Sequence, residues 1–229
     1  MTGTSAPEQP PQTGGHSGSH GILGGTFNPP HLGHVALARG ALQDLGLERV
    51  WLMPVHTPVH KPGERDPGPE HRLRMCRLAV AGIPGVGVCA MEVERGGRSY
   101  TVETLRAIHS SHPHARLTFI VGADTAATLP SWREPLAVLE LADLAVAARA
   151  GTARQRVLET IAQLPEPAGA AAPPHARVRF LAMPTIDVSS SRARELARSG
   201  APTAGLVGDA VAGYIEEHGL YRDTVREGR

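Results

Sequence analysis

The sequence predicts an α/β protein built on a doubly wound, mainly parallel sheet. Short apolar runs alternate along the chain with segments in which apolar residues recur at helical spacing, a rhythm typical of repeated β-α units. A glycine-rich loop follows the first apolar run and leads into the first helical segment. The length of 229 residues and the hydrophobic content of 41% suit one domain with a substantial core.

The first half of the chain contains four predicted strands, at residues 20–23, 49–53, 86–90 and 116–121. Helical spacing of apolar residues predicts helices at 35–45 and 70–81, and a third helix that opens at 99–101. Residues 92–98 are predicted to be a polar continuation of the third strand, and Ser99 to cap the helix after it. On the second helix, Arg72, Arg74 and Arg77 predict a solvated face.

The second half continues the alternation with fewer apolar residues. We expect a short helix ending near Pro130, strands at 144–147 and 178–181, helices at 152–164 and about 192–199, and a closing segment at 207–218. Residues 1–19 are rich in Pro, Gly, Ser, Thr and Gln and predict a disordered tail. The organisation expected is therefore a tail at 1–19 and a single domain at 20–229.

Composition argues against several classes of function. The net charge of +1, from 23 basic and 22 acidic residues, gives no electrostatic reason to expect nucleic acid or an anionic membrane as partner. Aromatic residues make up 3% of the chain, too few to favour a stacking platform for single strands. Cys76 and Cys89 lack metal or redox spacing and suit a reducing cytoplasm, and no apolar run approaches the roughly 20 residues that span a bilayer.

The loop at residues 24–34, Gly-Gly-Thr-Phe-Asn-Pro-Pro-His-Leu-Gly-His, is the first candidate site. Gly24 and Gly25 allow a sharp turn and a close approach of a ligand to the backbone. His31 and His34 are three residues apart and therefore share a face of the next helix's first turn. Since a helix start presents free N–H groups and a positive dipole, this loop is a candidate for binding phosphate and stabilising developing negative charge.

A second candidate anion site lies near the C-terminus, where Ser189, Ser190 and Ser191 begin a helix and Arg194 follows one turn later. Taken alone, the serines could be an ordinary helix cap. In a parallel sheet, however, ligands bind beyond the carboxyl ends of the strands. That rule gathers residues 25–34, 54–69, 122–124 with Trp132, and 189–194 around one crevice, where the two anion sites could clamp a triphosphate.

These residues resemble known enzymes. The pattern Gly-x-Phe-x-Pro-x-His-x-Gly-His resembles the nucleotidyltransferase superfamily, whose members join a nucleoside monophosphate to a phosphate-bearing acceptor and release pyrophosphate. Further matches narrow the resemblance to the bacterial nicotinate-mononucleotide adenylyltransferases; they are residues 99–101, 122–124, 132–133, Arg149, 189–194 and the closing Gly-Leu-Tyr-Arg. The resemblance runs from about His20 to Arg222. Asn28 departs from the family's usual Asp, and Ala150 from its frequent Pro.

The resemblance implies a Rossmann-like nucleotidyltransferase fold and transfer of AMP from ATP to nicotinate mononucleotide in NAD biosynthesis, with Mg²⁺ accompanying ATP. It implies these catalytic residues: His31, His34 and Arg194. It implies these contacts to ATP: Gly25, Thr26, Phe27, His31, His34, Ser190, Ser191 and Arg194. For nicotinate mononucleotide it implies Thr101, Gly122, Asp124, Trp132 and Arg149. Lys61 is a weaker candidate for the acceptor phosphate, and a solvated lysine is the alternative interpretation. No metal site made by the protein alone is expected, and a homo-oligomer is left open.

Other functions compete with this interpretation. The acceptor could be nicotinamide mononucleotide, because backbone N–H groups read a carboxylate without a sequence signature. Pantetheine-phosphate adenylyltransferase and cytidylyltransferase activities belong to the same superfamily, but Trp132 and the Ser-Tyr-Thr stretch at 99–101 argue against both. A module that binds nucleotide without turnover is the alternative outside enzymes, and the intact His31, His34 and Arg194 argue against it.

Overall fold

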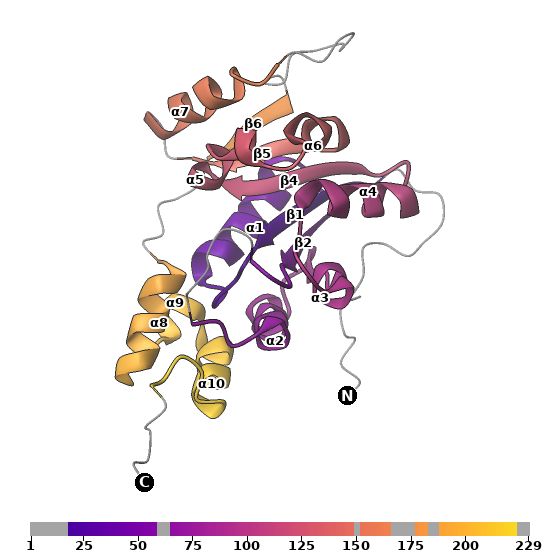
Figure 1. Cartoon of the computed structure of the whole chain (residues 1–229). Helices are drawn as coiled ribbons and strands as arrows, with labels where there is room; N and C mark the ends of the chain where they lie inside the picture. Colours follow the sequence, from indigo (N-terminus) through magenta and orange to yellow (C-terminus); the bar gives the residue numbers. More distant parts are fainter. Residues whose placement is uncertain (1–17, 59–64, 149–151, 166–176, 183–187, 224–229) are drawn as a thin grey trace.

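The computed structural model describes residues 18–58, 65–148, 152–165, 177–182 and 188–223. Its centre is a six-stranded parallel sheet in the order β3-β2-β1-β4-β5-β6 (Figure 1). The strands are β1 (Ser19–Gly25), β2 (Arg49–Pro54), β3 (Val86–Val88), β4 (Arg116–Gly122), β5 (Asp143–Ala147) and β6 (Val178–Leu181). The predicted doubly wound parallel sheet is confirmed, and β1 begins at Ser19, inside the predicted tail.

The strand order reverses between β1 and β4, the two central strands. Leu23 of β1 lies opposite Leu52 on one side and Ile120 of β4 on the other. The chain winds outward from β1 through β2 to β3, and then outward again from β4 through β5 to β6. Loops after β1 and β4 therefore leave the sheet in opposite directions, which opens the crevice where ligands of such sheets bind.

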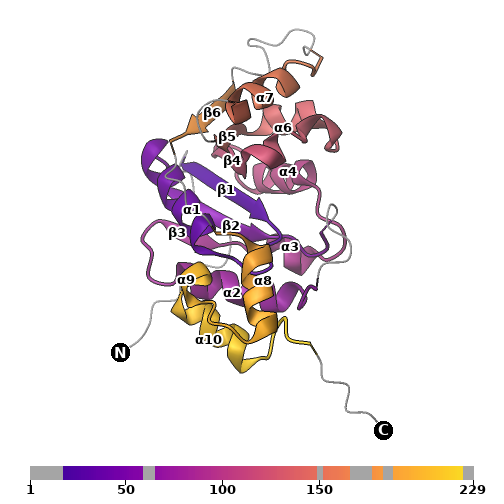
Figure 2. The ribbon, with the colours of Figure 1, turned by 90° about the vertical axis from the view of Figure 1, so that its left-hand side faces the viewer.

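Helices cover both faces of the sheet (Figure 2). They are α1 (Leu32–Asp44), α2 (Pro69–Val80), α3 (Met91–Arg95), α4 (Thr101–Ser111), α5 (Ala123–Ala126), α6 (Pro135–Leu141), α7 (Thr152–Ile161), α8 (Ser190–Ser199), α9 (Ala204–Val207) and α10 (Asp209–Glu217), with a 3₁₀ turn at Leu129–Ser131. In the described part of the chain, no helix is long and apolar enough to cross a bilayer.

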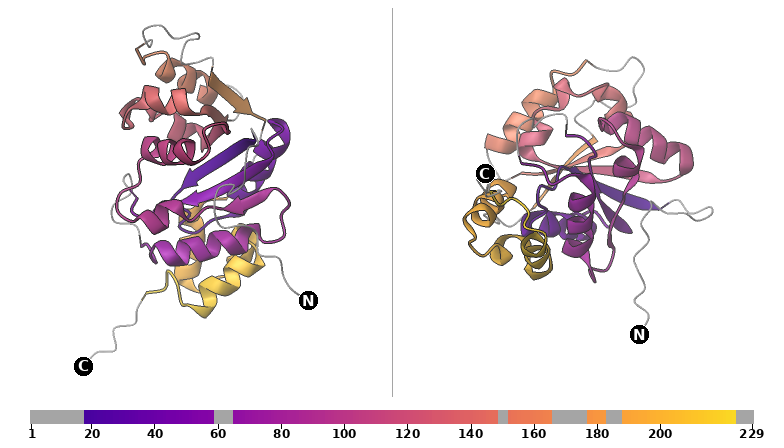
Figure 3. Two further views of the ribbon diagram at one scale, coloured as in Figure 1. Left: turned by 90° about the vertical axis from the view of Figure 1, so that its right-hand side faces the viewer. Right: turned by 60° about the horizontal axis from the view of Figure 1, so that its bottom comes forward.

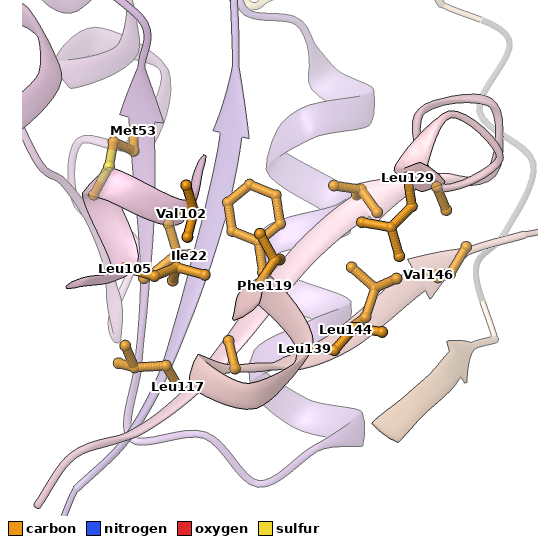
Figure 4. Packing of buried hydrophobic residues seen from close by; sticks show 14 of the residues in the cluster. Ile22, Met53, Val102, Leu105, Leu117, Phe119, Leu129, Leu139, Leu144 and Val146 are labelled. Carbon is orange, nitrogen blue, oxygen red and sulfur yellow. The ribbon is translucent and has the colours of Figure 1, made fainter. Parts of the chain in front are cut away.

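The larger core cluster lies between the sheet and helices α4, α6 and α7 (Figure 4). Ile22 and Phe119 project from the two central strands, and Leu105 of α4 and Leu139 of α6 pack against them. Burying each such side chain stabilises the fold by about 1.5–3 kcal/mol. A second cluster on the opposite face joins α1 and α2 to the sheet. These layers fix the ends of β1 and β4, which border the crevice.

The C-terminal helices form a separate layer against α2 (Figure 3). Ala193 of α8, Val211 and Ile215 of α10, and Tyr221 pack around Met75 of α2, and all of them are buried. None of the residues in this cluster belongs to a strand of the sheet. Its consequence for the site is that the first turn of α8 is held beside the loop that follows β1.

Several local predictions are wrong. Residues 91–95 form helix α3 instead of a polar turn, because Glu92 and Val93 face the interior. Ser99 does not cap α4: Tyr100 occupies the N-cap position without a side-chain hydrogen bond, and the Ser99 hydroxyl accepts from the His56 backbone N–H (3.3 Å). Helix α6 was not predicted.

The predicted solvated face of α2 is also wrong at one residue. Arg72 is completely buried, while Arg74 is exposed. The buried positions of α2 are Arg72, Leu73, Met75, Cys76 and Val80. Arg72 belongs to this stripe because Cys76 follows it by four residues, the spacing of neighbours on one helix face.

Candidate active site

The loop after β1 is packed too tightly for larger residues at its start. A β-carbon on Gly24 would lie 2.8 Å from the ring of Phe119, and one on Gly25 would lie 3.2 Å from the ring of Phe27. Phe27 has a positive φ of 52° and only 2% of its surface is exposed. Its ring meets that of His34 edge-on, with 4.8 Å between centroids. The Phe27 side chain therefore supports His34, and only its backbone is left to face a ligand.

His31 and His34 come together at the start of α1, as the sequence predicts. Their rings are stacked with centroids 3.6 Å apart and planes inclined by 21°. The backbone N–H of His31 donates to Nδ1 of His34 (3.1 Å). Since Nδ1 accepts, neutral His34 must carry its proton on Nε2. The contact thereby selects the tautomer that can donate from Nε2.

His31 is uncharged at neutral pH. Burial lowers the pKa of His31 to about 4, although a hydrogen bond to its own backbone acts in the opposite direction. The pair is therefore not two cations in contact. The geometry lets the rings offer hydrogen bonds to an incoming anion.

Helix α8 contacts the loop after β1 directly, so the two predicted anion sites are adjacent. The Ser190 hydroxyl donates to the Pro29 carbonyl (2.8 Å), and Nη1 of Arg194 donates to the Asn28 carbonyl (2.7 Å). Nη2 of Arg194 donates to the Ser191 hydroxyl (3.2 Å). Ser189 is the helix cap, accepting from the Arg192 N–H (3.2 Å). The serines thus serve both as a cap and as a link to the loop.

The residues predicted for the acceptor lie beyond the ends of β4 and at the start of α4. Gly122 ends β4, Asp124 lies in the first turn of α5, and both are exposed. Trp132 is half-buried; its ring stands perpendicular to Phe119 with centroids 5.8 Å apart, and its indole N–H donates to the Thr128 hydroxyl (3.0 Å).

Thr101, the first residue of α4, is brought near Trp132 by contacts of the adjoining residues. Arg133 lies 5.0 Å over the Tyr100 ring and pairs with Glu103. Arg149 and Lys61 lie outside the described residues, as does Ala150. These contacts connect the start of α4 with the segment around Trp132.

Sequence reasoning named Asn28 only as a departure from the family's usual Asp and did not foresee its contacts, and it missed Arg72 altogether. Asn28 is 3% exposed; its Nδ2 donates to the Arg65 carbonyl (2.9 Å), while its buried Oδ1 has no hydrogen-bond partner among the described residues. Nη1 of Arg72 donates to the Thr26 carbonyl (2.9 Å). The position of Arg72 on the apolar stripe of α2 was the signal that could have identified it.

A metal site built from side chains alone is not found in the described ranges: they hold no group of three or more His, Cys, Asp and Glu residues suited to bind an ion. The polar groups around the loop are imidazole, hydroxyl, guanidinium and a buried amide oxygen. Such a donor set fits an ion that arrives bound to phosphate and retains several waters, as Mg²⁺ commonly does.

Comparison with known proteins finds relatives that match most of the chain. A family model described as cytidylyltransferase-like matches residues 22–196. A Symbiobacterium thermophilum protein named "probable nicotinate-nucleotide adenylyltransferase" is 41% identical over 201 residues, covering 87% of this chain and 93% of the relative. A Salinibacter ruber protein of the same name is 37% identical over 205 residues, covering 89% and 98%.

A solved structure shares the fold at low sequence identity. The Plasmodium falciparum nicotinic acid mononucleotide adenylyltransferase complexed with NaAD superposes with a TM-score of 0.67 at 16% identity, over 89% of this chain and 97% of the other. Together with the relatives above, the match extends over nearly the whole described fold. The chain therefore belongs to the cytidylyltransferase-like family and, within it, to the nicotinate-nucleotide adenylyltransferases.

Proposed function

We propose that this protein transfers AMP from ATP to nicotinate mononucleotide, forming nicotinate adenine dinucleotide and pyrophosphate. The observation that supports the proposal is the direct contact of α8 with the loop after β1: Ser190 and Arg194 donate to carbonyls of the loop that leads into His31 and His34. The names of the relatives support the substrates, because two of them are 41% and 37% identical over most of the chain.

The proposed chemistry needs no general base. A phosphate oxygen of the acceptor is already an anion, and it attacks the α-phosphorus of ATP. The new P–O bond forms as the bond from the α-phosphorus to the bridging oxygen breaks, and that electron pair leaves with pyrophosphate. Positioning and stabilisation of the added negative charge then account for the rate.

The residues of the loop and of α8 divide this task. We assign His31 and His34 to the α- and β-phosphates, with His34 donating from Nε2. Arg194, with the hydroxyls of Ser190 and Ser191, is assigned to the leaving pyrophosphate. Gly25, Thr26 and Phe27 complete the ATP site through backbone contacts, because the Phe27 ring is buried.

Mg²⁺ is proposed to accompany ATP, where it would neutralise charge on the phosphate oxygens. The protein's own part is to hold the phosphates that carry the ion. That role belongs to the N–H groups at the start of α1 and to the guanidinium and hydroxyls of α8.

The acceptor site is proposed at Thr101, Gly122, Asp124 and Trp132, with Arg149 and Lys61 as further candidates. Trp132 would stack on the pyridine ring, and Asp124 would lie near a ribose. Backbone N–H groups near 131–133 and the Thr101 hydroxyl would read the carboxylate of nicotinate. They would lack an acceptor facing the NH₂ of nicotinamide, which favours the acid.

The test is pyrophosphate release by the full chain with Mg-ATP, measured with nicotinate mononucleotide, nicotinamide mononucleotide and phosphopantetheine in parallel. We expect turnover with the first acceptor to exceed the other two by about a hundredfold or more. Turnover with phosphopantetheine alone would contradict the proposed acceptor. Nucleotide binding without turnover on any acceptor would favour a binding module.

A further inference from the structure

Arg72 holds two loops of the crevice together from inside the protein. Its side chain is completely buried. Nη1 donates to the carbonyls of Thr26 (2.9 Å) and Val55 (2.6 Å), and Nη2 donates to the carbonyl of His56 (2.6 Å). Thr26 lies in the loop after β1, and Val55 and His56 follow β2. One guanidinium from α2 therefore bridges the segments that leave two adjacent strands.

The charge of this guanidinium is compensated within the same network. Nε of Arg72 donates to Oδ1 of Asp66 (2.9 Å), and the two side chains form an ion pair. A paired cation contributes little net field at the phosphates. The rigid fork of Arg72 matters more, because four donor–acceptor contacts in different directions need several N–H groups held in one plane. A lysine ammonium, with one nitrogen, cannot reproduce that arrangement.

The contact to Thr26 has a consequence for anion binding. The peptide between Thr26 and Phe27 is trans, so its N–H points away from its carbonyl. With the carbonyl turned toward Arg72, the Phe27 N–H faces the opposite side of the loop. Arg194 and Ser190 hold two further carbonyls of the loop, those of Asn28 and Pro29. Three donors thus engage carbonyl oxygens that would otherwise be able to repel a phosphate.

We propose that Arg72 is a positioning residue for the reaction: it fixes the orientation of the loop after β1 and its distance from the loop after β2. It does not touch substrate in this role. The expected kinetic effect rests on the proposed function. The ordering of the two loops by one guanidinium does not depend on which reaction the site performs.

The experiment compares Arg72→Lys and Arg72→Met with Arg74→Lys and Arg74→Met, matched changes at an exposed residue of the same helix. For each folded protein, the KM for ATP and kcat are measured by pyrophosphate release. Hydrogen exchange is followed by mass spectrometry at residues 24–30 and 55–58 of the full chain. A residue that only stabilised the fold would lower kcat in proportion to the folded fraction and leave KM unchanged.

We expect Arg72→Lys to lower kcat/KM for ATP about a hundredfold, with part of the loss in KM, because small misplacements of reacting groups cost this much. Exchange at 24–30 and 55–58 should rise together, and Arg72→Met should behave similarly. Both Arg74 variants should stay within about twofold of wild type. Wild-type-like exchange and KM in Arg72→Lys would overturn the proposal. The proposal would also be overturned if Arg72→Lys kept its activity while Arg72→Met lost it, because the positive charge and not the geometry of the guanidinium would then be needed for activity.

Two further measurements test the role of Arg72 if its variants do not fold or if the wild-type protein is inactive. If neither Arg72 variant folds, Asp66→Ala removes one partner of Arg72 at a partly exposed site, with Glu70→Ala as its control. It should loosen the same two loops and lower kcat/KM about tenfold, and unchanged exchange there would refute the role. If wild-type protein releases no pyrophosphate with ATP and nicotinate mononucleotide, the proposed function fails, while hydrogen exchange still decides the role of Arg72.

Discussion

The two sides of the crevice are built differently. On the proposed phosphate side, the loop after β1 is held by long-range contacts that include those with Arg72, Ser190, Arg194 and the Arg65 carbonyl. On the acceptor side, Gly122 and Asp124 are exposed, and Trp132 is oriented by a neighbouring hydroxyl and a perpendicular ring. The phosphate side is thus organised before substrate arrives, which suits electrostatic stabilisation. The proposed acceptor side offers an aromatic surface, so we expect its selectivity to depend on a few donors around it.

The largest expected effect tests the organised side. His34→Ala should lower kcat by roughly two to three orders of magnitude, the usual loss for one charge-stabilising donor. His34→Asn should be as inactive but more stable than His34→Ala, because its side-chain oxygen can still accept from the His31 N–H. Steady-state pyrophosphate release and thermal unfolding measure the two effects. His109→Ala, at an exposed residue of α4, is the control, and near-wild-type turnover of His34→Ala would refute the assignment.

The next effect tests selectivity on the less organised side. We expect kcat/KM for nicotinate mononucleotide to exceed that for nicotinamide mononucleotide by at least about a hundredfold, because each unsatisfied buried group costs about 1–3 kcal/mol. Trp132→Ala should weaken both substrates and largely preserve their ratio, since stacking does not distinguish acid from amide. Equal efficiencies in the wild-type enzyme would instead indicate dual specificity.

A smaller effect concerns Asn28, where the family resemblance leads us to expect Asp. Asn28→Asp removes the donor to the Arg65 carbonyl and places a carboxylate beside that oxygen. We expect a loss of about 1–3 kcal/mol in unfolding free energy with the fold unchanged, measured by urea unfolding. Asn28→Ala loses the same donor without adding a charge and should cost less. Equal stability of Asn28→Asp and wild type would show that this contact does not hold the loop.

The last expected effect is a pH dependence of stability. Folded His31 has a pKa of about 4, against 6.5 in the unfolded chain. The unfolded chain therefore binds the proton first as pH falls, so the stabilisation present above pH 6.5 is lost progressively toward pH 4. The unfolding free energy of wild type should decline more steeply over that range than that of His31→Gln. Parallel curves for the two proteins would contradict the depressed pKa.

The contiguous part of the site could be predicted from sequence, because its glycines and histidines lie within one loop. The contacts of Arg72, Arg194 and Ser190 to that loop could not, since their acceptors are backbone carbonyls, which every residue carries. Helix α6 was not predicted because it spans only Pro135–Leu141, which is too short to show a clear helical spacing of apolar residues. It also starts after Glu134, whose positive φ of 51° separates it from the preceding turn. Arg149 and Lys61 remain predictions, because they lie outside the described residues.

The closure of the loop after β1 by α8 also bears on synthesis of the chain. Ser190 and Pro29 are 161 residues apart in sequence, and Arg194 and Asn28 are 166 apart. During translation the central strands can pair long before α8 leaves the ribosome, because domains form from the N-terminal end as the chain emerges. The proposed ATP site therefore reaches its final form among the last events of folding. A nascent chain that stops before α8 would hold the phosphate loop without its two outer donors.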